Sequence, residues 1–155
     1  MNNMDKLSLK KEILEAGKAK MRTVINDFQE RIDELKAVTI GDDFQETASQ
    51  SESRKDSDIE LLDTLATQMD FAQAELETLN LIDPALAHSK IEFGSVVVTD
   101  KRTFFVSTGI EEFDVQGNAY FGISTQAPLY KGLVNKETGD KVAFNGIEYN
   151  IQDVF

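Results

Sequence analysis

Two stripes of apolar residues at an average spacing of 3.5 residues constrain this chain most. The first stripe is broken only by Lys18 and comprises Leu14, Met21, Ile25, Phe28, Ile32 and Leu35. The second comprises Leu62, Leu65, Met69, Ala72, Leu76 and Leu79. Alternating steps of three and four place each set on one side of a helix, which is the coiled-coil pattern. Two such helices joined by a linker bury each other most simply as an antiparallel hairpin, so both stripes are predicted to be core.

The segment between the stripes leaves the start of the second helix open. Gly41 can end the first helix, which is predicted from about Ser8 to Val38. Ser57 and Glu60 form a capping box that would start the second helix at Asp58. A start near Glu46 gives the two helices similar lengths, and this longer helix is favoured.

Composition changes near residue 84. Both prolines and seven of the nine glycines lie beyond residue 83. Residues 1–83 carry a net charge of −9, and residues 84–155 carry −3. The sequence therefore predicts two domains, a helical hairpin over 1–83 and a second domain over 84–155.

The second domain is predicted to be rich in β-structure. Residues 95–99 and 102–107 indicate a hairpin, and residues 119–124 a third strand. Asn145-Gly146, flanked by strands at 141–144 and 147–151, is a strong hairpin signal. Pro128 is suited to the first turn of a short helix over 128–134. The fold class is therefore α+β, with a sheet of four to six strands.

Composition excludes several classes of function. The net charge of −12 argues against a surface that grips a nucleic-acid backbone by itself. Cysteine is absent, and His88, predicted to be an exposed linker residue, is the single histidine. Thiolate chemistry and sites with two imidazoles are thereby excluded. No apolar run is long enough to span a membrane and the first residues are polar, so a cytoplasmic protein is expected.

Acidic residues gather at the predicted tip of the hairpin, near residues 41–46. Asp43 and Glu46 are three positions apart and would project on one side of a helical turn, with Asp42 beside them. Two carboxylates can hold Mg²⁺ when water and phosphate complete its coordination. A solvated acidic loop is the other interpretation of this segment.

The order of these parts resembles the Gre transcript cleavage factors of bacterial RNA polymerase. The similar residues run in the family's order: Ile82-Asp83, Phe93-Gly94-Ser95-Val96-Val97, Ile123-Ser124, Pro128-Leu129, Gly139-Asp140-Lys141-Val142 and Gly146–Ile151. The resemblance implies that the C-terminal domain has a fold like that of FKBP-type prolyl isomerases and serves for docking.

The resemblance also implies a function. The protein would not be an enzyme itself but would bind RNA polymerase at the rim of its secondary channel, with Pro128, Leu129 and Lys131 as docking residues. Its coiled coil would reach into the channel. Asp43 and Glu46, with Asp42, would then help to hold the second Mg²⁺ of the polymerase active site and stimulate cleavage of backtracked RNA.

The chain departs from the family at several positions. Ala127 and Tyr130 replace a serine and a glycine of the family pattern, and Val134-Asn135-Lys136 stands at its L-G-K segment. At the tip the family has G-D-x-x-E, whereas the third residue after Asp42 is Gln45, so the acidic pair keeps its spacing only from Asp43 to Glu46. Two alternatives stay open: a regulator that occupies the channel without promoting cleavage, and a coiled-coil, FKBP-like protein-interaction module.

Overall fold

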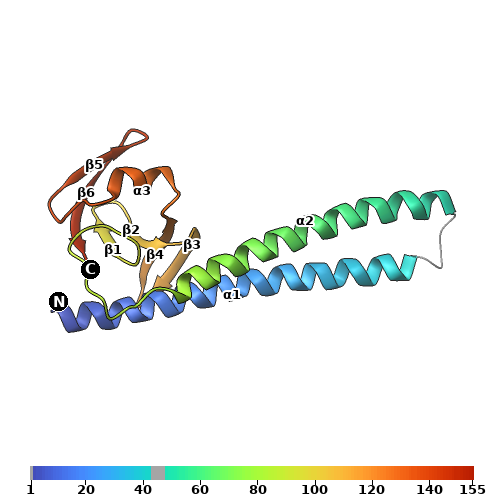
Figure 1. Ribbon diagram of the computed structural model, residues 1–155, viewed down its shortest axis with the longest axis horizontal. Helices are drawn as coiled ribbons and strands as arrows, with labels where there is room; N and C mark the ends of the chain where they lie inside the picture. The colour runs from blue at the N-terminus through green and yellow to red at the C-terminus, as the bar shows by residue number, and fades with distance from the viewer. Residues whose placement is uncertain (1, 43–47) are drawn as a thin grey trace. The chain divides into compact units, whose positions relative to one another are not determined.

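The computed structural model describes residues 2–42 and 48–155, with side chains described over 2–38 and 56–155. Two long helices, α1 (Asn3–Asp42) and α2 (Ala48–Asn80), precede the β-structure (Figure 1). The strands are β1 (Val96–Thr99), β2 (Thr103–Ser107), β3 (Ile110–Val115), β4 (Asn118–Ser124), β5 (Lys141–Phe144) and β6 (Ile147–Val154). The short helix α3 (Pro128–Leu133) lies between β4 and β5. The predicted α+β class is confirmed.

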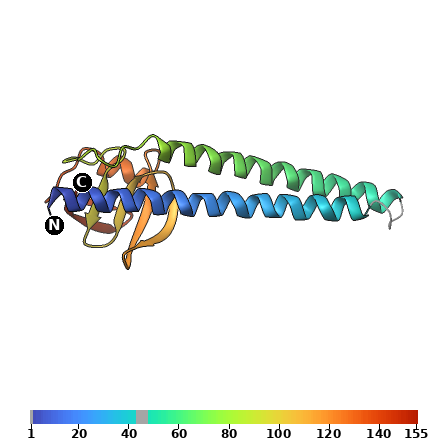
Figure 2. The same cartoon turned by 90° about the horizontal axis from the view of Figure 1, so that it is seen from below.

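The two long helices form the predicted antiparallel hairpin. Every apolar stripe residue is buried or half-buried; Met21, Ile32, Leu65 and Ala72 are each less than 8% exposed. Both views show the helices side by side along the hairpin (Figures 1 and 2). The start of α2 at Ala48 confirms the longer second helix, and the alternative start at Asp58 is wrong. The first helix continues past Gly41 to Asp42, so that glycine does not end it.

The six strands make one mixed sheet in the order β3-β4-β2-β1-β6-β5. The hairpins β1–β2 and β5–β6 are antiparallel, as predicted. Asn145 and Gly146 join β5 to β6 with positive φ angles of 50° and 77°, a backbone that favours Asn-Gly in a two-residue turn. The pairing of β2 with β4 is parallel, which the sequence did not indicate.

Strand β3 was not predicted. Glu111 and Glu112 are adjacent exposed residues, and the register with β4 shifts between Ile110 and Phe113. This irregularity breaks the alternation of apolar and polar residues by which a strand is recognised. The turn that follows, Gln116-Gly117, has positive φ at both residues and joins β3 to β4.

The sheet buries residues on both faces. One face packs with α3 around a core of Ile91, Val97, Phe104, Val106, Leu133, Val142, Tyr149, Ile151 and Val154. On the other face, Val96 pairs with Phe105, Phe105 with Gly122 and Gly122 with Ile110, so these four residues form one row across four strands. The Cα of Gly17 in α1 lies so close to this row that a Cβ there would be 3.2 Å from Cδ1 of Ile110.

The contacts divide the chain into two compact units. One unit takes in the chain up to Lys20 together with Glu75–Phe155, and the other is Met21–Ala74. The first unit thus contains the start of α1, the end of α2 and the sheet. The second unit is the remainder of the helical hairpin. The predicted boundary at residue 83 lies just after α2 and stays a prediction.

His88 is a correction to the sequence analysis. Its side chain is buried, not exposed, and its Nδ1 lies 2.5 Å from Oε1 of Glu92. Its Nε2 would be 3.5 Å from a Cβ at Gly94, a residue with φ of +91°. The segment after α2 packs closely enough to enclose the imidazole, and composition alone does not reveal such packing.

Candidate functional site

The predicted acidic tip falls where the structure describes least. Asp43 and Glu46 lie outside the described residues, and Asp42 is the last residue of α1 with its side chain outside them. Within the residues that are described, no three His, Asp or Glu side chains gather as a metal site. The predicted Mg²⁺ ligands therefore stay a prediction.

The predicted docking residues lie together on α3. Pro128 occupies its first turn and is exposed, and Lys131 is exposed in its last turn. Leu129 is half-buried and packs against the core of the sheet. Two of the three residues are therefore on the surface, and their docking role stays a prediction. Ala127, the N-cap residue before Pro128, makes no side-chain hydrogen bond to cap the helix.

A groove of about 420 Å³ opens between the two helices of the hairpin unit. It lies where the apolar stripes approach their distal ends, and it is lined by Arg31, Glu34, Leu35, Val38, Leu61 and Leu65. Leu65 is buried, but Val38 is 55% and Leu61 48% exposed. Ile59, two residues before Leu61 in α2, is 54% exposed. Apolar side chains beside the stripes are therefore exposed on both helices here.

The hairpin unit is strongly acidic. Residues 21–74 contain 13 acidic and 5 basic side chains, a net charge of −8. The two segments beside the groove, 27–38 and 56–65, contain eight acidic residues against two basic ones, Arg31 and Lys36. Such a surface attracts cationic partners and repels nucleic acid and other acidic surfaces.

Lys10 of α1 is fully buried in the other unit. Its Nζ donates a hydrogen bond of 2.6 Å to the carbonyl oxygen of Leu86, in the segment that follows α2. Burial lowers the pKa of Lys10 to about 8 from an ordinary 10.5, and the negative charges of Asp83 and Glu92 oppose that shift. The lysine thus ties the start of α1 to the connector between α2 and β1.

We expect the stability of the protein to rise between pH 8 and pH 10.5 because of Lys10. The folded state gives up the proton at a lower pH than the unfolded state, so the desolvation cost below pH 8 is relieved as pH increases. Relative to Lys10→Met, the wild type should gain about 2 kcal/mol in unfolding free energy from pH 7 to pH 10.

Urea unfolding at both pH values measures this gain. Lys11→Met, which removes the adjacent exposed lysine, is the matched control and should follow the wild type. If the difference in unfolding free energy between the wild type and Lys10→Met stays constant with pH, the lowered pKa of Lys10 is contradicted.

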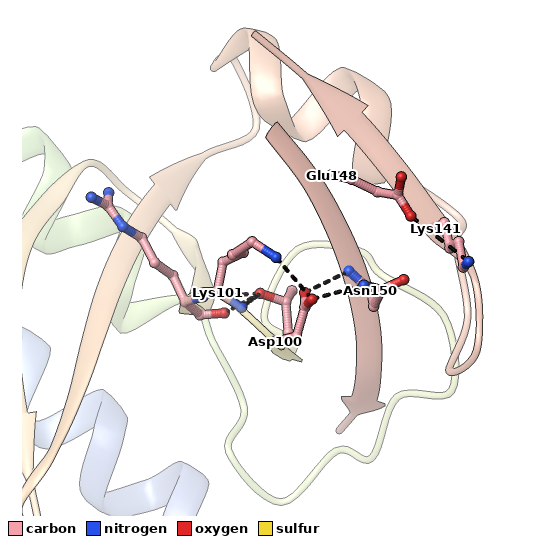
Figure 3. A network of polar contacts seen from close by, with 7 residues as sticks. Asp100, Lys101, Lys141, Glu148 and Asn150 are labelled. Carbon is pink, nitrogen blue, oxygen red and sulfur yellow. Dashed lines mark hydrogen bonds and ion pairs between the residues drawn. The ribbon is translucent and has the colours of Figure 1, made fainter. Parts of the chain in front are cut away.

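An exposed polar network fixes the β1–β2 turn against β6 (Figure 3). The backbone N–H and side-chain amide of Asn150 donate to Asp100 at 2.8 and 2.7 Å, and Nζ of Lys101 donates at 2.9 Å. These donors, the Asn150 backbone N–H first, hold the pKa of Asp100 well below its usual range. Nearby, Lys141 pairs with Glu148 across β5 and β6 at 3.8 Å. Strand pairing accounts for this cluster.

A hollow of about 390 Å³ lies between the start of α1 and the sheet. Lys6 and Asp153 stand at its edge, 2.8 Å apart, and Tyr120 and Phe155 form part of its lining. The ion pair uses the two charged groups of the lining, and Thr103 and Asn118 are further polar residues in it.

Sequence reasoning missed Lys10 and the groove. Lys10 stands four residues before Leu14 and so extends the first stripe, but its residue type argued against burial. Val38 likewise extends the stripe three residues beyond Leu35. The incomplete filling there could have been suspected from Asp58, a polar residue on the backward extension of the second stripe.

Comparison of the sequence with protein-family models and with curated proteins finds no match. Among solved structures, that of the transcription factor Gfh1 is similar over 90% of this chain and 93% of that chain, at 17% sequence identity and a TM-score of 0.34. A likeness this weak carries no argument about the present chain. In the part of the chain that is described, no helix has an apolar stretch that could cross a membrane.

Proposed function

We propose that this chain is a transcription elongation factor that binds RNA polymerase at the rim of its secondary channel and stimulates cleavage of backtracked RNA. The observation that carries the proposal is the combination of parts in one chain. An acidic antiparallel hairpin with Asp42, Asp43 and Glu46 at its predicted tip is followed by a six-stranded domain with an exposed short helix. The residues from Ile82 to Ile151 that resemble the Gre family support it.

In this proposal the chain has no catalytic centre of its own. The polymerase would supply the reacting phosphate and a tightly held Mg²⁺, and Asp43 and Glu46 would help to hold a second ion. A pair of bound ions would supply two-metal phosphoryl-transfer chemistry. The net charge of −8 on residues 21–74 suits this role. An acidic hairpin does not compete for nucleic acid, and it can bring carboxylates to a weakly held cation.

The docking role falls to α3. Pro128 and Lys131 are exposed, and Leu129 packs the helix against the core of the sheet. A basic side chain on a protein of net negative charge can set the orientation of docking.

A second function is favoured by one departure in the sequence. Gln45 stands where the family pattern, counted from Asp42, has its glutamate. A chain with an incomplete tip would occupy the channel as a regulator without promoting cleavage. A general protein-interaction module, with the hairpin serving for self-association, is the remaining alternative.

Transcript cleavage in a stalled, backtracked elongation complex tests these functions. With the protein present, Mg²⁺-dependent cleavage should accelerate. No acceleration, together with competition against a known cleavage factor, would identify the channel-occupying regulator. Failure to bind core polymerase, together with dimerisation in solution, would identify the interaction module.

A further inference from the structure

The distal half of the hairpin contains a groove between its two helices. Among the described residues, none covers the walls of this groove. Val38 on α1 and Leu61 on α2 are both about half exposed and line the same groove of about 420 Å³. Leu35 and Leu65 form its deeper lining. Large apolar side chains gathered in a concave surface are typical of sites that receive apolar side chains of a partner.

The charge around the groove restricts the partner. The flanking segments 27–38 and 56–65 carry a net charge of −6. A second copy of the chain would bring the same charge to the same place, and like charges in close contact are unfavourable. The charged residues of the lining itself are Arg31 and Glu34, so the attraction for a positively charged partner comes from the net charge of the flanking segments.

The length of the groove restricts the partner further. Its α1 wall runs from Arg31 to Val38, about 10 Å at 1.5 Å per residue, which is two turns of helix. A helix of two to three turns can place apolar side chains at positions i, i+3 or i+4, and i+7 over this distance. Its opposite face remains available for basic residues.

We propose that this groove binds a basic amphipathic helix of a partner protein, with Val38 and Leu61 as the apolar contacts and the surrounding carboxylates as the charged rim. The inference goes beyond the proposed function, because it needs neither the acidic tip nor α3. It specifies the chemistry of the partner segment rather than the identity of the partner.

The test uses a fluorescein-labelled synthetic peptide of 15 residues with leucines at helical spacing and lysines elsewhere. A peptide of the same composition with scrambled leucines controls for charge alone, and one with glutamate for lysine controls for apolar contact alone. Fluorescence anisotropy with the full chain should show binding of the first peptide about tenfold tighter than binding of either control peptide.

Variants locate the binding. Leu61→Asn and Val38→Asn keep the net charge and should each weaken binding of the amphipathic peptide about five- to tenfold. Phe71→Asn is the matched control, because Phe71 is 68% exposed on the same helix but does not line the groove, and it should bind as the wild type does. Circular dichroism checks that each variant keeps its helix content.

Three results would overturn the inference. These are absence of binding, equal weakening by Leu61→Asn and Phe71→Asn, and equal affinity for the lysine and glutamate peptides. Dimerisation of the wild type that Leu61→Asn abolishes would assign the groove to a second copy instead. The outcome is distinguishable from that of the proposed function, since transcript cleavage is measured without the peptide.

Discussion

The double variant Asp43→Ala, Glu46→Ala, which lacks both tip carboxylates, should reduce stimulated transcript cleavage at least about a hundredfold. Its binding to the polymerase should stay within about twofold of the wild type. Losing the ligands of a catalytic metal costs several kcal/mol of transition-state stabilisation, and each 1.4 kcal/mol is tenfold in rate. Binding is retained because the proposed docking residues lie on α3, in another part of the chain. Single-turnover cleavage and a polymerase binding assay measure the two quantities separately.

The control for this experiment removes the same charge elsewhere. Asp70→Ala with Glu77→Ala takes two exposed carboxylates from α2, and cleavage should stay near the wild-type rate. Equal loss in both double variants would assign the effect to net charge. Full cleavage stimulation by the tip variant would remove Asp43 and Glu46 from the mechanism and leave Asp42 as the remaining acidic candidate.

Gly122→Ala should destabilise the sheet by about 3 kcal/mol or more. Gly122 lies in the row between Phe105 and Ile110, and an added Cβ would be 2.5 Å from the carbonyl oxygen of Thr108 and 2.7 Å from Cβ of Ile110. Neither atom is the free end of a flexible side chain, so strands must move apart. Urea unfolding at pH 7 measures the loss.

Gly17→Ala is the matched control, because it approaches the same isoleucine from α1. Its Cβ would be 3.2 Å from Cδ1 of Ile110, a side-chain end that can shift, and alanine favours a helix over glycine by about 1 kcal/mol. The variant should stay within about 1 kcal/mol of the wild type. If Gly122→Ala is as stable as the wild type, then β2, β3 and β4 do not pair in the register described.

The regular parts of the fold were predictable, and the irregular ones were not. The stripes predicted the hairpin because helical spacing persists over many turns, and Asn145-Gly146 predicted the last β-hairpin because few residues adopt its backbone. Strand β3 was missed because a shift in register breaks its alternation. The parallel pairing of β2 with β4 joins segments that no local pattern connects.

Some candidate sites were named from the sequence, and others were seen only in the structure. The acidic pair was named from its spacing in the sequence and the docking residues from the family resemblance, and both stay predictions. The burial of Lys10 and His88 depends on which segments fold over them; Lys10 lies on the extension of the first stripe, but its residue type argued against burial. The groove required exposed fractions that only the assembled helices provide.

The ion pair between Lys6 and Asp153 joins residues 147 positions apart, and it belongs to a unit in which the start of α1 packs on the sheet. During synthesis, the first turns of α1 therefore leave the ribosome long before their packing partners exist. The helices of the hairpin can pair while the β-strands are still being made, whereas the base of α1 must wait for β6. The contact between the base of α1 and β6 therefore has a large sequence separation, and such contacts form slowly compared with local helix pairing.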